Sequence, residues 1–93
     1  MMVHYTDKAK NDLERAFGWY ETQRRGLGYD FLDCIESSII KILFTPEMYN
    51  IIYKNFRRCI IRRFPFSIFF TIENREVVIH SVFDNRQDPQ NRP

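Results

Sequence analysis

The sequence lacks the features that mark most metalloenzymes, nucleotide-binding enzymes and membrane proteins. It has no apolar run long enough to span a bilayer and no charged-then-apolar leader at its start, which predicts a cytoplasmic protein without a membrane partner. It also has no Gly-rich phosphate loop, no paired metal-ligand motif and no Ser/His/Asp or Cys/His arrangement at a useful spacing. These absences predict that the protein uses no metal and no other cofactor.

Cysteine and net charge are scarce as well. The two cysteines, Cys34 and Cys59, show no ligand spacing and fall in apolar segments, so we expect two reduced buried thiols rather than a disulfide. The net charge of +2 excludes a polycation of the kind that coats nucleic acid. The chain has 93 residues, of which 44% are hydrophobic, which suits one domain over residues 1–93 with a thin core.

Basic side chains are instead gathered in one short segment. Lys54, Arg57, Arg58, Arg62 and Arg63 crowd residues 54–63, and Arg86 follows later. Such a segment is typical either of a surface for a nucleic acid or another partner, or of a solvated edge strand that resists unwanted strand pairing. Both interpretations remain open at this point.

The second half of the chain predicts a small β-sheet. Apolar residues alternate from Phe66 to Ile72 and again from Val77 to Phe83, and the basic segment 57–63 forms a preceding strand. Between the two alternating runs, the sequence predicts that Asn74-Arg75 forms the loop of a tight hairpin.

This loop fixes a register for the hairpin. The register pairs Glu73 with Glu76, Phe70 with Ile79, Ile68 with Ser81, and Phe66 with Phe83, which places one apolar face toward a core. The opposite face is mixed and consists of Ser67, Phe69, Thr71, Val78, His80, Val82 and Asp84. If Phe64-Pro65 is the preceding turn, Arg58, Ile60 and Arg62 join this mixed face.

The first half of the chain predicts a strand and two helices. Residues 2–5 alternate like a strand, and Thr6 or Asp7 can cap the helix that follows. The apolar spacing predicts one helix up to Gly26-Leu27-Gly28 and a second from there to Pro46. We therefore expect an α+β fold in which an N-terminal strand and a helical hairpin pack on one face of a small antiparallel sheet. Residues 46–55 are expected to form a loop, and a polar tail begins at about residue 84.

The sequence resembles the RelE/ParE superfamily of type II toxins, which includes plasmid stabilisation proteins. The resemblance spans nearly the whole chain and rests on the order and spacing of Ala16, Trp19-Tyr20-Glu21, Gln23, Gly26-Leu27-Gly28, Phe31, Pro46, Tyr49, Arg62-Arg63-Phe64-Pro65-Phe66, Ile68, Phe70, Val82-Phe83, Arg86 and Asp88-Pro89. It implies a growth-inhibiting toxin that a small antitoxin neutralises by wrapping a flexible segment over it, in a hetero-oligomer of the two proteins. ParE-like members poison DNA gyrase, whereas RelE-like members cut messenger RNA on the ribosome.

The residues favour the ParE-like branch. Arg58, Arg62, Arg63 and Arg86 are candidates for binding a target or a phosphate group. RNA cleavage also needs proton-transfer groups, and RelE-like nucleases usually carry a Tyr or His near the C-terminus, which this tail lacks. Asp84 stands where many relatives carry His. The catalytic candidates are therefore His80, Asp84 and Arg86, with His4 a weaker one, and none of them is a strong assignment. For His80 itself, the simpler interpretation as a partly exposed strand residue is favoured over a catalytic role.

Aromatic and apolar residues suggest the remaining roles. Trp19 and Tyr20 are expected to pack in the core rather than to stack on bases, while Phe69, Val78 and Val82 on the mixed face are expected to contact the antitoxin. The leading hypothesis is a toxin, more simply a binding protein than an enzyme, that inhibits DNA gyrase. One alternative is a ribosome-dependent endoribonuclease of RelE type, and another is an inactive relative that only binds an antitoxin.

Overall fold

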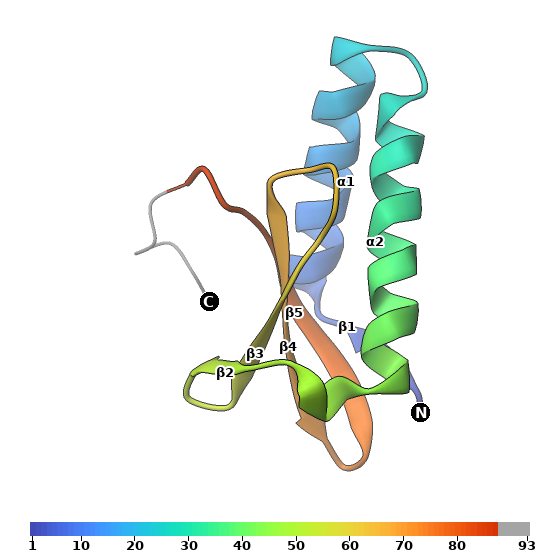
Figure 1. Ribbon diagram of the computed structural model, residues 1–93. Coiled ribbons are helices and arrows are strands. Elements are labelled where there is room, and N and C mark those ends of the chain that lie inside the picture. The colour runs from blue at the N-terminus through green and yellow to red at the C-terminus, as the bar shows by residue number, and fades with distance from the viewer. Residues whose placement is uncertain (88–93) are drawn as a thin grey trace.

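The structure is a computed structural model that describes residues 1–87. Along the chain lie β1 (Val3–Tyr5), α1 (Asp7–Gln23), α2 (Leu27–Phe44), the short 3-10 helix η1 (Pro46–Met48), β2 (Ile51–Tyr53), β3 (Phe56–Ile60), β4 (Phe66–Glu73) and β5 (Glu76–Asp84). The two helices run antiparallel and stand against one face of the sheet (Figure 1). The predicted strand, helical hairpin and sheet are therefore confirmed. Residues 88–93 of the predicted tail lie outside the described residues.

The sheet has five strands in the order β1-β5-β4-β3-β2. All neighbouring strands are antiparallel except β1, which runs parallel to β5, so the sheet is mixed rather than purely antiparallel. The segment expected to be a loop contains η1 and the edge strand β2, which the sequence did not indicate. The basic strand ends at Ile60, and Ile61–Pro65 form a loop, so Arg62 lies beyond the strand in which it was predicted.

Local sequence signals explain where the helices begin. The Thr6 hydroxyl accepts a hydrogen bond from the Ala9 amide at 3.1 Å, which caps α1 as predicted. The turn between the helices needs Gly26, whose φ is +90°. The amide of Gly28 then donates to the Glu21 carboxylate at 2.7 Å, which closes the helical hairpin.

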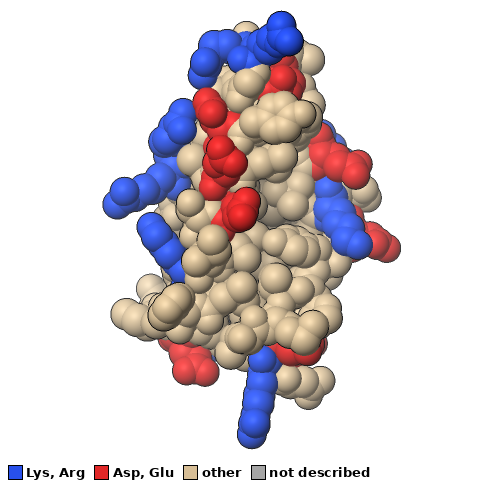
Figure 2. Space-filling model, turned by 90° about the vertical axis from the view of Figure 1, so that its right-hand side faces the viewer, with Lys and Arg blue, Asp and Glu red and all other residues tan. Residues whose placement is uncertain are grey.

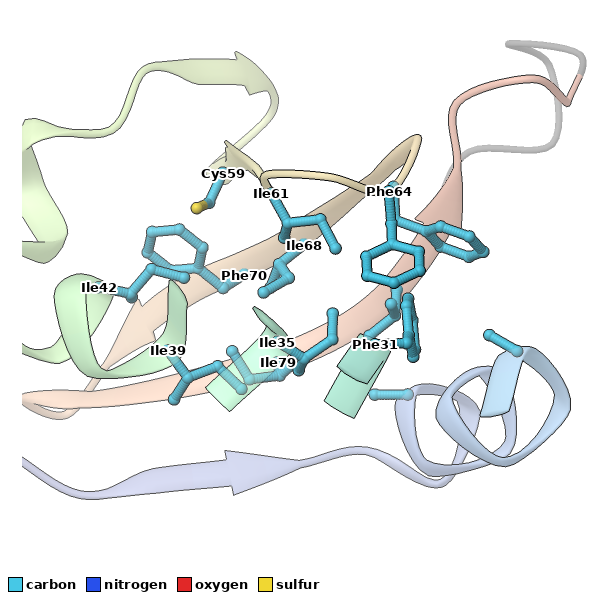
Figure 3. Packing of buried hydrophobic residues seen from close by; sticks show 14 of the residues in the cluster. Phe31, Ile35, Ile39, Ile42, Cys59, Ile61, Phe64, Ile68, Phe70 and Ile79 are labelled. Carbon is cyan, nitrogen blue, oxygen red and sulfur yellow. The ribbon is translucent and has the colours of Figure 1, made fainter. Parts of the chain in front are cut away.

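The core lies between the helices and the sheet. Figure 3 shows Phe31, Ile35, Ile39 and Ile42 of α2 facing side chains of the sheet, among them Ile68, Phe70 and Ile79. The Tyr20 ring of α1 stacks on Phe31 at 5.4 Å between centroids and meets Phe64 edge-on at 4.9 Å. Burial of these apolar side chains is the main term that holds the helices on the sheet.

The β4–β5 hairpin confirms part of the predicted register and contradicts the rest. Asn74 and Arg75 form the loop with φ values of 51° and 62°, and Phe70 pairs with Ile79 as predicted. Beyond that pair, however, Phe69 pairs with Ser81, so His80 is an extra residue in β5 and creates a β-bulge.

The bulge shifts the register by one residue beyond His80. The predicted pairs of Ile68 with Ser81 and of Phe66 with Phe83 are wrong, because Ile68 faces Val82 and Phe66 faces Asp84. Val82 consequently enters the core, where it is 4% exposed, although it was predicted to lie on the mixed face.

Three features of residues 1–87 concern the cysteines, membrane-spanning helices and metal ligands. Both cysteines are free, with Cys59 buried and Cys34 half-buried. Within residues 1–87, no helix is both long and apolar enough to cross a membrane. In the same part of the chain, no group of three His, Cys, Asp or Glu side chains is arranged to hold a metal ion.

Candidate functional site

A groove of about 360 Å³ lies between α1 and the C-terminal end of β5. Its floor is apolar and buried, with Ala16, Tyr20 and Phe66 each 6–7% exposed. Its rim carries exposed cationic side chains, including Arg15 and Arg86. A groove with an apolar floor and polar groups at its edge is the usual form of a binding site.

Asp12 fastens α1 to β5 at one side of this groove. Its Oδ2 accepts hydrogen bonds from the Val82 amide at 3.0 Å, the Ser81 hydroxyl at 3.2 Å and the Lys8 ammonium at 3.0 Å. β1 pairs with β5 only as far as Ile79, so beyond this point the edge of β5 needs another partner for its amides. The carboxylate of Asp12 supplies it and keeps α1 close to the strand.

Asp84, Arg86 and Trp19 form the other side of the groove. The Arg86 guanidinium donates to both Asp84 oxygens, through Nε at 2.9 Å and Nη2 at 2.7 Å, and lies 5.7 Å from the centroid of the Trp19 ring. The hydrogen bonds from Arg86 hold the pKa of Asp84 below its ordinary value, and the carboxylate in turn raises the pKa of Arg86. Trp19 is 50% exposed, which contradicts the prediction that it packs in the core, whereas Tyr20 is buried as expected.

His80 lies in a different environment from Asp84 and Arg86. Its Nε2 is 2.8 Å from the Thr71 hydroxyl and 3.5 Å from the Glu73 carboxylate, and its ring meets the Phe56 ring edge-on at 4.9 Å. His80 is not among the residues that line the groove. The structure therefore unites two of the three main catalytic candidates and leaves the third apart.

The other predicted cationic residues are dispersed. Arg63 lies in the loop before β4, where its guanidinium is 3.7 Å from the Asp30 carboxylate of α2, and Arg62 is exposed beside it. Arg58 is half-buried on β3 opposite Phe69. These three residues do not line the groove that contains Arg86. Their proposed roles in binding a target or phosphate remain predictions.

The predicted antitoxin-contact residues offer little surface. Phe69 is 1% exposed and its ring meets Phe83 edge-on at 5.9 Å, so it is not the exposed aromatic residue that the prediction assumed. Val82 is buried in the core because of the bulge at His80, and Val78 is half-buried. A direct contact of these side chains with an antitoxin stays a prediction, but their expected exposure is wrong for Phe69 and Val82.

Sequence reasoning missed most of the groove, although a signal was present. Lys8, Asp12, Arg15 and Trp19 follow one another at intervals of four, three and four residues, which places them on one stripe of α1. The helix thus has a second stripe beside the apolar one that faces the core. Because this stripe is mostly polar, the sequence alone indicates an ordinary solvated face. Its role in the groove becomes apparent only in the structure, where the end of β5 lies beside it.

The groove is chemically suited to binding rather than to proton transfer. General acid–base catalysis needs a group that exchanges a proton readily near the reacting bond. Asp84 has a lowered pKa and both of its oxygens hold Arg86, so it is a weak base. Trp and Arg side chains beside an apolar floor are, by contrast, the residues that most often anchor protein partners.

Comparisons with known proteins agree with this fold. The chain matches the fold of a toxin–antitoxin structure from P. aeruginosa, described as a chromosomal ParDE system, with a TM-score of 0.81, 18% identity, and coverage of 90% of this chain and 95% of that one. It also matches a chain of the intact E. coli RelBE toxin–antitoxin complex, with a TM-score of 0.66, 12% identity, and coverage of 89% and 94%. No curated protein matches the chain in sequence.

The family model described as the ParE toxin of the type II toxin–antitoxin system parDE matches residues 3–89. This match includes every helix and strand of the structure and the whole of the groove. The chain therefore belongs to the ParE toxin family.

Proposed function

We propose that this toxin inhibits growth by binding DNA gyrase through the groove beside α1, and that a cognate antitoxin neutralises it in a cytoplasmic complex. The gyrase target is what the resemblance to ParE-like toxins implies. The observation that carries the binding mode is Trp19, half exposed beneath the Arg86 guanidinium at the edge of an apolar floor. Such a pair contributes a large contact area and directed hydrogen bonds to a partner.

A second candidate function rests on His80. Its Nε2 lies near both a hydroxyl and a carboxylate, an arrangement that can orient an imidazole for proton transfer. An endoribonuclease of RelE type would use His80 as the base, with the cations Arg58, Arg62, Arg63 and Arg86 available for phosphate. The separation of His80 from the Asp84–Arg86 pair favours the gyrase proposal over this alternative.

The test combines cells with purified gyrase. Inducing the chain alone should stop labelled thymidine incorporation before labelled amino-acid incorporation, and the purified toxin should inhibit gyrase supercoiling in vitro. Trp19→Ala and Arg86→Ala should each weaken that inhibition about 10- to 100-fold, which corresponds to roughly 1.4–2.8 kcal/mol of binding free energy. Arg75→Ala, at the exposed tip of the β4–β5 hairpin, is the matched control and should leave inhibition unchanged.

Each alternative predicts a distinct result. If amino-acid incorporation stops first and His80→Ala abolishes toxicity, the endoribonuclease function replaces the gyrase proposal. If the chain binds its antitoxin but inhibits neither process, it is an inactive relative. If Trp19→Ala and Arg86→Ala inhibit gyrase as strongly as the wild type, gyrase binds elsewhere on the toxin.

A further inference from the structure

Four exposed arginines gather at the end of the molecule where the α1–α2 turn meets the loop before β4. Arg24 and Arg25 belong to the turn, and Arg62 and Arg63 belong to the loop. Figure 2 shows basic side chains over the top of the molecule, where Figure 1 places the α1–α2 turn. We call these four residues the arginine cluster. None of the four lines the groove.

Asp30, in the first turn of α2, brings the two parts of the cluster together. Its Oδ2 lies 3.7 Å from the Nη2 atom of Arg24 and 3.7 Å from that of Arg63. A direct N–H···O hydrogen bond spans about 2.7–3.2 Å, so neither contact is one. The Arg24 and Arg63 side chains are 65% and 59% exposed. Two neighbouring guanidinium groups therefore face solvent with donors that Asp30 does not take up.

The backbone beneath the cluster is held in place on both sides. Ile61 and Phe64 are buried and anchor the loop in the core (Figure 3). Between them, Arg63 has a φ of 71°, a conformation that favours glycine. In the turn, the Arg24 amide donates to the Tyr20 carbonyl at 3.1 Å. Arginines that point outward from a fixed backbone, one of them at an unfavourable φ, are typical of a binding site.

The charge and polarity of the cluster indicate a polyanion rather than a protein as its partner. Two carboxylates, Glu21 and Asp30, belong to the adjoining helix ends, and Glu21 already accepts the Gly28 amide. Cations thus outnumber acids there by two to one, whereas the whole chain has 14 cations and 12 acids. The exposed residues 22–25 are all polar. Protein interfaces have an apolar centre with few charges, whereas phosphate groups are contacted by Arg, Thr and Gln side chains such as these.

The cluster adjoins the groove. The Tyr20 ring in the floor of the groove meets the Phe64 ring at 4.9 Å between centroids, and the Arg63 guanidinium lies 5.5 Å from the centroid of that Phe64 ring. A partner bound in the groove is therefore next to the cluster. Gyrase acts on duplex DNA, each strand of which carries one negative charge for about every 3.4 Å of the helix axis. Guanidinium groups match phosphate oxygens in geometry and bind them through paired hydrogen bonds.

From these observations we infer that the arginine cluster binds the phosphate backbone of duplex DNA. The toxin then contacts gyrase through the groove and the DNA held by gyrase through Arg24 and Arg63, with Arg25 and Arg62 beside them. The contact with DNA on gyrase rests on the proposed function, whereas the affinity of the cluster for DNA does not. Because phosphates carry no sequence information, binding to DNA alone should be weak, independent of sequence and sensitive to salt.

Fluorescence anisotropy with a labelled duplex of about 20 base pairs and the purified toxin tests DNA binding without gyrase. We expect a Kd of about 1–100 µM near physiological salt. Arg24→Ala/Arg63→Ala should raise the Kd at least about 10-fold, and the slope of log Kd against log salt concentration should fall by about 1.8, since each lost phosphate contact removes about 0.9. Arg24→Lys/Arg63→Lys keeps the charge and should restore most of the slope.

The double variant Lys54→Ala/Arg75→Ala is the matched control. It removes the same charge from the β2–β3 and β4–β5 turns, at the opposite end of the molecule (Figure 1). Both residues are exposed and have positive φ, 49° and 62°, as Arg63 does. This variant should bind the duplex with a Kd within about threefold of the wild type. Circular dichroism melts check that each variant is folded.

Gyrase assays connect the cluster with the groove. Arg24→Ala/Arg63→Ala should bind gyrase without DNA within about threefold of the wild type, yet inhibit supercoiling about 10-fold less strongly. Trp19→Ala should, by contrast, weaken binding to gyrase both with and without DNA. A wild-type toxin that binds the duplex but neither binds nor inhibits gyrase would refute the proposed function and the contact with DNA on gyrase, and would leave the DNA affinity of the cluster standing.

Three outcomes overturn the inference. Equal Kd values for Arg24→Ala/Arg63→Ala and the wild type would show that DNA does not contact the cluster. Equal losses in the cluster variant and in the Lys54→Ala/Arg75→Ala control would show that only the overall charge of the toxin matters. Tighter binding of a single-stranded RNA of the same length, lost in the cluster variant, would assign the cluster to RNA instead of DNA.

Discussion

Replacing Gly28 with alanine tests the close contact between the two helices. A methyl group at Gly28 would lie 2.7 Å from the Phe17 carbonyl oxygen and 2.8 Å from the Cδ1 of the Phe17 ring. The Cγ of Glu21, whose carboxylate accepts the Gly28 amide, would also lie 2.7 Å away. A backbone oxygen cannot move aside as a side chain can, so α2 must shift away from α1. We expect Gly28→Ala to lower the free energy of unfolding by about 1–3 kcal/mol.

Gly18 provides a matched control for this substitution. It lies inside α1, and a methyl group there would meet no atom within 4 Å other than its chain neighbours and the nearby backbone of α1 itself. Gly18→Ala should therefore stabilise the protein by about 0.5–1 kcal/mol, because alanine loses less conformational freedom than glycine when a helix forms.

Thermal unfolding followed by circular dichroism at 222 nm measures both changes. In a domain of this size, 1 kcal/mol corresponds to about 4–8 °C in melting temperature, so the two variants should melt on opposite sides of the wild type. Equal melting temperatures for Gly28→Ala and the wild type would show that the helices are not held as closely as the structure places them. Destabilisation by Gly18→Ala would contradict the open surroundings of that residue.

Three further predictions follow from the polar and buried groups. Asp12→Ala should cost about 1–3 kcal/mol in urea unfolding, because the Val82 amide loses its acceptor at 3.0 Å; an unchanged midpoint would refute this role. Hydrogen bonds from Arg86 lower the pKa of Asp84 in the folded protein. The pair therefore stabilises the fold at pH values above the ordinary pKa of an aspartate, and this stabilisation is lost as the pH falls through the pKa of Asp84 in the folded state. Arg86→Ala should thus cost a few tenths of a kcal/mol at pH 7, since the pair is partly exposed, and the cost should shrink in parallel melts as the pH is lowered below the ordinary carboxyl range. Burial raises the pKa of the Cys59 thiol and shields its sulfur. In a Cys34→Ser variant, Ellman's reagent at pH 8 should therefore react with Cys59 only as fast as the protein unfolds. A faster reaction would show that the reagent reaches the sulfur in the folded protein.

The parts of the fold that were predicted correctly depend on signals within a few residues. Thr6 caps α1 through the amide three residues later, and the apolar spacing of each helix follows the turns of that helix alone. The Asn74-Arg75 loop was also found, because both residues must adopt positive φ and asparagine does so at little cost. In each case the determining contact lies close in sequence, so the sequence pattern contains it.

The parts that were missed depend on distant residues. Strand β2 has three residues, all exposed, so it lacks the alternation that indicates a strand, and only its pairing with β3 makes it one. Trp19 was expected in the core because Tyr20 beside it belongs there, but adjacent helical residues point about 100° apart. Its exposed position becomes meaningful only when Arg86, 67 residues later in the chain, lies over its ring.

The bulge at His80 connects the error in register with the formation of the groove. Without the extra residue, Asp84 would share a face of β5 with His80, as predicted, and a base, a carboxylate and Arg86 could have met there. With it, Asp84 pairs with Phe66 on the face that carries the helices, and the carboxylate holds Arg86 against Trp19 of α1. One residue in one strand thus separates the catalytic candidates and builds the edge of the groove at the same time. Because a bulge arises from pairing between two strands rather than from either strand alone, the alternating pattern of β5 could not indicate it.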